Sequence, residues 1–192
     1  RISFTGELSY EINIRARHGL ALWTHLMKAG TEFGITPYGT EAMHVLRAEK
    51  GFIIVGQETD GSVTPQDLGM DWIVSKVKPD YIGKRALERA SMAADNRKQL
   101  VGLRTKERKQ VIPEGAHAVL DPNQPMPMDM LGQVTSSYYS PNVGSSIAMA
   151  MLKGGRALMG GTVYLPMLDG SMIEAEVVEP IFYDPKGERL NG

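Results

Sequence analysis

Six short apolar segments, separated by turn-forming residues, occupy the second half of the chain and constrain its fold more than any other feature. Gly, Pro, Asn and Asp recur between these segments. Several short strands joined by such turns are typical of a small antiparallel barrel or sandwich. The expected strands are residues 99–103, 116–120, 132–136, 146–152, 162–165 and 173–178.

The first half of the chain shows helical periodicity instead. Apolar residues recur at helical spacing over 19–28 and again over 40–50, and a short helix is expected over 80–93. Thr40 is a candidate N-cap, because its hydroxyl can accept an unpaired backbone N–H of the first turn. The polar segment 56–69 is rich in turn formers, which predicts a long surface loop.

The opening residues alternate in the manner of a β-structure. Residues 3–5 precede a Gly-Glu turn, and Tyr10, Ile12 and Ile14 share one face at a period of two. We therefore expect two short strands, over 3–5 and 10–14. Because a single hairpin is not stable alone, we also expect further strands upstream, so that the chain would be a piece of a longer protein.

The charged stretch at 95–98 marks the change from the mixed pattern to the β pattern. The sequence therefore predicts an α+β fold in two parts. Residues 1–95 would form the C-terminal part of a mixed α+β domain, and residues 96–192 a small antiparallel β-barrel.

Composition excludes several classes of protein. The 192 residues include 21 basic and 22 acidic side chains, so no excess of positive charge draws the chain to nucleic acid or an anionic membrane. Without cysteine there is no disulfide framework, thiolate catalysis or cysteine-based metal site, which fits a reducing compartment. No apolar run approaches the roughly 20 residues of a membrane-spanning helix.

Few clusters point to catalysis by themselves. The four histidines lack metal-ligand spacing, so no metal site is expected. Ser136, Ser137 and Ser140 lie close together without a nucleophile-elbow motif. The Gly-rich segment 153–161 carries two cations but lacks a P-loop ending, which favours a β-turn over a phosphate site. The Met-rich run 125–130 predicts an irregular loop that fills an uneven gap or a partner surface.

Glu11 is the side chain that the pattern singles out for binding. On a strand, a carboxylate can accept two parallel hydrogen bonds from an amidine-like edge such as that of a 2-amino-pyrimidinone ring. The alternative is a solvated residue paired with Arg15 or Arg17. Arg47 and Glu49 are in the same way expected to form a structural ion pair.

A set of ordered motifs resembles the folate-binding T-protein (aminomethyltransferase) family. Residues 1–12 look like the family's R-x-S-[YF]-T-G-E-x-G-[YF]-E-[IV], residues 37–51 like P-x-G-x-x-A-x-x-x-L-R-x-E-x-G, and residues 64–72 like T-P-x-x-x-G-L-x-W. Similar strings continue at 81–87, 97–103, 132–136 and 140–150. The resemblance implies the aminomethyltransferase folate-binding fold.

The match is closer to one branch of that family. Residues 41–57 and 180–189 resemble the C-terminal region of the α subunits of heterotetrameric sarcosine oxidases. This resemblance implies a bacterial cytoplasmic complex with β, γ and δ subunits, containing FAD, FMN and NAD outside this region. Such an oxidoreductase demethylates sarcosine and passes the one-carbon unit to tetrahydrofolate, giving 5,10-methylenetetrahydrofolate.

The resemblance assigns three folate-binding residues. Glu11 matches the glutamate that holds the pterin edge, Phe4 stands where the family commonly has a tyrosine beside the folate, and Trp72 ends the third motif. Met43 replaces an arginine and Val55 a tyrosine, which departs from the aminomethyltransferases and fits the sarcosine oxidase branch.

No catalytic residue is expected within this chain, because the family's catalytic aspartate precedes the first motif. The fragment alone is therefore expected to be inactive and to bind folate weakly or not at all. Two alternatives remain open at this point. One is an aminomethyltransferase or related folate-dependent demethylase, and the other is a module that only docks onto partner subunits.

Overall fold

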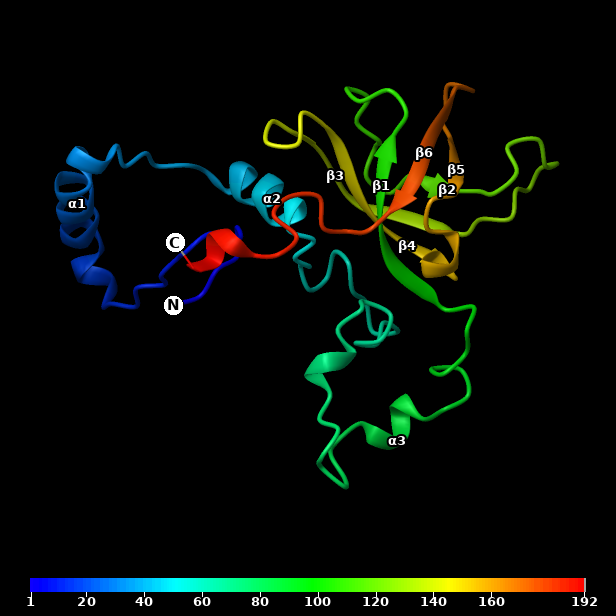
Figure 1. Cartoon of the computed structure of the whole chain (residues 1–192), viewed down its shortest axis with the longest axis horizontal. Coiled ribbons are helices and arrows are strands. Elements are labelled where there is room, and N and C mark those ends of the chain that lie inside the picture. Colours follow the sequence, from blue (N-terminus) through cyan, green and yellow to red (C-terminus); the bar gives the residue numbers. More distant parts are fainter. Residues whose placement is uncertain (192) are drawn as a thin grey trace.

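A six-stranded antiparallel sheet forms the body of the protein (Figure 1). The computed structural model describes residues 1–191. The strands follow the order β2-β3-β4-β1-β6-β5. Their bounds are β1 Lys98–Thr105, β2 His117–Ala118, β3 Gly132–Ser140, β4 Ser145–Lys153, β5 Thr162–Pro166 and β6 Met172–Val178. All six strands expected from the apolar segments are present, so the predicted α+β class with an antiparallel β half is confirmed.

The sheet curls until its two edge strands meet. Val119, just after β2, forms an isolated antiparallel bridge with Tyr164 of β5, with N···O distances of 2.8 and 3.0 Å. Side chains on the concave face, among them Val101, Leu152 and Val177, are fully buried and fill the interior. The short apolar strands thus form a barrel whose core is apolar.

The helices lie in the first half of the chain. Helix α1 (Gly19–Ala29) and helix α2 (Thr40–Glu49) confirm the two helical predictions. The predicted N-cap is wrong by one residue, because extended Gly39 holds that position and no side chain caps the helix. In Figure 1, α2 lies against the barrel, whereas α1 lies far from it at the left.

Two of the expected elements differ from the structure. The helix expected over 80–93 is reduced to α3 (Lys84–Leu87) because its surroundings are exposed, Ile82 fully, and a short helix without packing is marginal. Residues 3–5 and 10–14 form no strand, since strands need a paired neighbour and the segment's backbone contact is Leu8 N–H to Arg189 O at 3.0 Å. Five short 3-10 helices complete residues 1–191: Ala16–His18, Thr31–Phe33, Asp71–Ile73, Gly155–Leu158 and Glu188–Asn191.

A buried polar network joins α2 to the barrel. Arg47 forms an ion pair with Glu58 at 3.1 Å, and both side chains are completely buried. Ser136 of β3 donates its hydroxyl hydrogen bond to Glu58 and accepts one from Arg47. The expected Arg47–Glu49 pair is therefore wrong: the two side chains leave the helix in different directions and find different partners.

The loop 56–69 is only partly at the surface. It forms no helix or strand, as expected, but Glu58, Thr64 and Asp67 are buried. Gln57 also reaches β3, where its amide donates to the carbonyl of Thr135 at 2.9 Å, next to the register shift between Val134 and Ser136. The loop thus covers one face of the sheet. No helix of residues 1–191 is both long and apolar enough to cross a membrane.

Candidate functional site

A mainly apolar cavity of about 630 Å³ lies where the N-terminal segment, the chain after α2 and the barrel meet. Its walls come from residues 3–4, 50–53, 68–72 and 179–181, together with β1 and the 3-10 helix after β4. Volumes of this size are usual for small-molecule sites, which are mostly apolar with a few polar groups. Elements distant in the sequence thus enclose one site.

Three aromatic rings line this cavity, those of Phe4, Phe52 and Trp72. Phe4 comes from the N-terminal segment and Trp72 from the 3-10 helix Asp71–Ile73. Trp72 is 72% exposed, so one side of its ring is available for stacking against a flat ligand. Two of the three residues predicted to bind folate are therefore brought together here.

Glu11 lies outside that lining. Its side chain is exposed, and within residues 1–191 it forms neither a hydrogen bond nor the alternative ion pair with Arg15 or Arg17. The carboxylate that lines the cavity with the aromatic rings is Glu179, just after β6. Sequence reasoning missed Glu179, although it lies beside the motif at 180–189 that carried the resemblance.

Two cations also line the cavity. Lys50 is buried and donates to the carboxylate and carbonyl of Asp184. Burial raises the pKa of Asp184, but hydrogen bonds from Lys50 and from the backbone of Glu188 and Arg189 outweigh it and leave that pKa below its ordinary value. Arg156 donates to the carbonyls before the 68–72 wall. Its segment forms a short 3-10 helix followed by the expected turn, in which Gly161 N–H donates to the carbonyl of Leu158 at 2.8 Å.

The last turn of α2 fixes one wall of the cavity. The Glu49 carboxylate accepts hydrogen bonds from Ser140 at 2.6 Å and Asn142 at 2.9 Å, at the end of β3. Its backbone carbonyl accepts from the N–H groups of Phe182 and Tyr183, at 2.8 and 3.0 Å. Glu49 thereby attaches the 179–183 segment to both α2 and the barrel.

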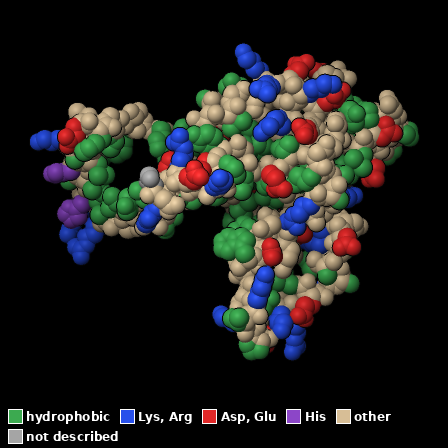
Figure 2. All heavy atoms as spheres, in the orientation of Figure 1, with side chains coloured by type: hydrophobic (Ala, Val, Ile, Leu, Met, Phe, Trp, Pro, Cys, Tyr) green, Lys and Arg blue, Asp and Glu red, His purple; other side chains and the backbone are tan. Residues whose placement is uncertain are grey.

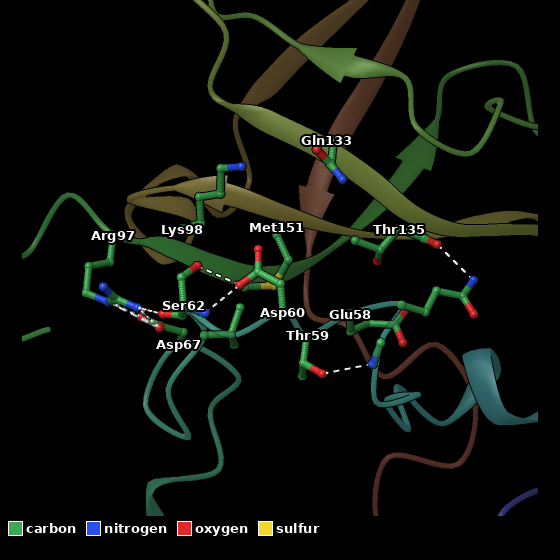
Figure 3. Close-up of a pocket in the computed structure, with 13 residues that line it drawn as sticks. Glu58, Thr59, Asp60, Ser62, Asp67, Arg97, Lys98, Gln133, Thr135 and Met151 are labelled. Atoms are coloured by element: carbon green, nitrogen blue, oxygen red, sulfur yellow. Dashed lines mark hydrogen bonds and ion pairs between the residues drawn. The ribbon is translucent and has the colours of Figure 1, made fainter. Parts of the chain in front are cut away.

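A second, polar cavity of about 400 Å³ lies between the loop 56–69 and the sheet. Figure 3 shows that several of its side chains form hydrogen bonds with one another: Arg97 donates to Asp67, and Ser62 donates to Asp60. Burial raises the pKa of Asp67, but hydrogen bonds from Arg97 and Thr64 outweigh it and leave a lowered pKa. These contacts attach the loop to the strand start at β1, so the cavity has a structural explanation.

Metal-ligating residues do not gather at either cavity. Among residues 1–191, no group of three or more His, Asp or Glu side chains is placed to hold a metal ion. The chemistry of the apolar cavity is therefore that of three aromatic rings, one carboxylate and two cations.

Comparison with known proteins gives matches over both halves of the chain. Residues 1–78 match the family described as GCVT N-terminal domain, and residues 98–184 match the glycine cleavage T-protein C-terminal barrel domain. The chain is 48% identical to a sarcosine oxidase subunit alpha from Corynebacterium sp. (strain P-1), over 100% of this chain and 20% of the relative. An aminomethyltransferase from Halothermothrix orenii is 33% identical, over 93% of this chain and 48% of the relative.

A solved structure shares the fold. The glycine cleavage system aminomethyltransferase T from Bartonella henselae superposes with a TM-score of 0.81 at 25% identity, covering 95% of this chain and 48% of that one. The chain thus spans about a fifth of the length of the sarcosine oxidase relatives and about half of the aminomethyltransferases.

Proposed function

The chain belongs to the glycine cleavage T-protein family, and on that premise we propose that its apolar cavity binds tetrahydrofolate. The bound folate accepts the one-carbon unit released by the oxidative demethylation of sarcosine and becomes 5,10-methylenetetrahydrofolate. We further propose that the chain is part of the α subunit of a cytoplasmic sarcosine oxidase with β, γ and δ partners, in which FAD, FMN and NAD bind elsewhere. The proposed boundary between its two domains lies at residues 95–96.

The observation that carries this proposal is the convergence of Phe4 and Trp72 on one cavity. A folate presents two flat ring systems, which pack well against aromatic faces. The volume of about 630 Å³ lies within the range of cofactor sites. Lys50 and Arg156 are suited to the carboxylates of the glutamyl end, and Glu11 or Glu179 to the amino edge of the pterin.

The protein's own contribution to such chemistry is binding and orientation. The reduced folate supplies the nucleophilic nitrogens, and the cavity walls hold them in one position and limit access of water. We assign no catalytic residue within this chain.

Titration of the full-length protein with tetrahydrofolate tests the proposal. Trp72→Ala removes one stacking face, which we expect to weaken binding roughly 5- to 150-fold, the equivalent of about 1–3 kcal/mol for a stacked ring. Trp23→Ala is the matched control, because Trp23 is 54% exposed on α1 and lies outside the cavity lining. Equal affinities of the two variants would reject this site.

The pterin-binding carboxylate is tested separately. Glu11→Gln and Glu179→Gln keep the size of the side chain but remove the charge that a bidentate contact uses. A loss of affinity in Glu11→Gln supports the role implied by the family motif, and a loss in Glu179→Gln alone assigns that role to the carboxylate in the cavity. Unchanged affinity in both variants contradicts a carboxylate contact in the chain.

The second candidate function is that of an aminomethyltransferase. It is favoured by the relative from Halothermothrix orenii and by the fold shared with the Bartonella henselae enzyme. A protein that purifies without flavin subunits and transfers an aminomethyl group from a lipoyl carrier would establish it. Copurification with flavin-bearing partners and turnover of sarcosine would establish the first.

A further inference from the structure

A Met-rich groove of about 830 Å³ opens at the end of the barrel farthest from α1. It lies between the segment 110–117, the loop 126–130 and the turn that joins β5 to β6. Its walls are the side chains of Met126, Met128, Met130, Met167 and Leu168. We call this surface the Met groove.

The floor of the Met groove is continuous with the barrel interior. Ala116 and Met167 pack against the buried core, so an inserted side chain would extend that core. The rim is unusually open: Leu168 is 110% exposed, Met126 80% and Val111 43%. Contiguous apolar surface of this kind marks interaction sites, and methionines adapt their shape to a partner.

The formal charges of the groove all have one sign. Glu114 and Asp169 line it, and its lining contains no Lys or Arg. Hydrogen bonds from the Ser171 hydroxyl and backbone lower the pKa of Asp169, so this carboxylate stays ionised near neutral pH. Figure 2 shows hydrophobic and acidic side chains together at the right-hand end of the barrel.

We propose that the Met groove binds a segment of another subunit, one that presents large apolar side chains flanked by Lys or Arg. No segment of residues 1–191 fills the groove, and in Figure 1 the helices α1 and α2 lie to the left of the barrel and α3 lies below it. Two copies facing each other through this groove would bring Glu114 and Asp169 against their own equivalents, which disfavours self-association. A basic, apolar segment meets both the shape and the charge.

The existence of another subunit rests on the proposed function, because relatives of the chain are named as subunits alpha. The groove is independent of the folate cavity, since the two linings share no residue. Folate binding and partner binding can therefore fail separately.

Photo-crosslinking in the full-length protein, purified with whatever accompanies it from its native cells, tests the inference. A benzoylphenylalanine at position 168 should crosslink to a different polypeptide. The same probe at position 82, where Ile82 is 105% exposed, is the matched control and should not. A product of twice this protein's mass, a link within the chain, or no product at 168 would overturn the proposal.

Charge substitutions give a second readout. Leu168→Asp should weaken retention of that polypeptide at least tenfold, while Ile82→Asp should change it less than twofold. Both side chains are fully exposed, so neither change disturbs the fold, and tetrahydrofolate titration of the same samples confirms an intact protein. Retention should also fall as salt rises, because salt screens charge pairs. Equal retention by both variants, or retention that does not depend on salt, would contradict the groove as the contact.

Discussion

Replacement of Arg47 by methionine should lower the free energy of unfolding, because it breaks the buried network that joins α2 to the barrel. Both members of the Arg47–Glu58 pair have side chains that are 0% exposed, at a distance of 3.1 Å. Arg47 also donates to the carbonyl of Phe52 at 3.1 Å and to the hydroxyl of Ser136. Arg47→Met therefore leaves the Glu58 carboxyl group buried without its cation.

The size of the expected loss of stability depends on the hydrogen bonds that Glu58 still accepts in the variant. Loss of one partner of a buried ion pair typically costs about 3–5 kcal/mol. Glu58 still accepts the N–H of Ile54 at 2.7 Å and the hydroxyl of Ser136, which places the expected loss near the lower end, about 3 kcal/mol. Methionine fills the volume of the arginine stem, so packing contributes little. In Arg47→Met/Glu58→Gln the charge is gone, and roughly half of the loss should return.

Urea unfolding with linear extrapolation measures both variants. The matched control is Lys106→Met, because the Lys106–Glu174 pair has a similar distance, 3.0 Å, but side chains that are 78% and 44% exposed. Exposed pairs contribute about 0–1 kcal/mol. A loss below about 1 kcal/mol for Arg47→Met, or one no larger than that of Lys106→Met, would refute the argument that burial makes this pair important.

Three further predictions concern the loop, the barrel and the cavity. The pKa of Asp67 lies below its ordinary 3.8, so its carboxylate stabilises the fold fully above about pH 4. This contribution is lost as the pH falls through the lowered pKa. Asp67→Asn should therefore make the free energy of unfolding less dependent on pH on the acid side. In Gly132→Ala the new Cβ would lie 1.9 Å from the carbonyl oxygen of Met151, so β3 and β4 would have to move apart. The free energy of unfolding should fall by about 3 kcal/mol or more. An unchanged melting temperature would contradict this prediction. Gly51 has φ +66°, and a Cβ there would lie 2.5 Å from the carbonyl oxygen of Pro180. Gly51→Ala should therefore shift that cavity wall and weaken tetrahydrofolate binding, as measured by calorimetry. Gly56 is the control, because its φ is also positive but a Cβ there would meet no atom within 4 Å, so Gly56→Ala should leave binding unchanged.

The barrel could be predicted because its evidence is local. Each strand is a short apolar segment between turn residues, and these features do not depend on the rest of the protein. The predicted strands at 3–5 and 10–14 depend on alternation at a period of two, yet Tyr10, Ile12 and Ile14 remain 69%, 53% and 45% exposed and unpaired. Alternation indicates that a segment can form a strand, whereas the hydrogen bonds of a strand come from a neighbour that the pattern cannot identify.

The candidate site was only partly within reach of sequence reasoning. Phe4 and Trp72 were identified through motifs, and both line the cavity. Glu179 belongs to no chemical motif, and Arg156 lies in a Gly-rich segment that pointed to a turn. Both line the cavity because β6 and the 3-10 helix after β4 end beside it. Glu58 was read as part of a surface loop, since its burial depends on a strand about 80 residues away in the chain.

The last turn of α2 shows why spacing alone could not reveal this arrangement. Four consecutive residues, 47–50, are buried, which no one-sided helix pattern allows. Arg47 contacts the loop and β3, Glu49 contacts the end of β3 and the backbone of 182–183, and Lys50 reaches Asp184. The helix therefore ends where the loop after it, the end of β3 and the segment 179–184 meet, and this junction borders the cavity. Because these polar side chains replace apolar packing there, a substitution in the junction should alter ligand binding as well as stability, although only Lys50 lines the cavity.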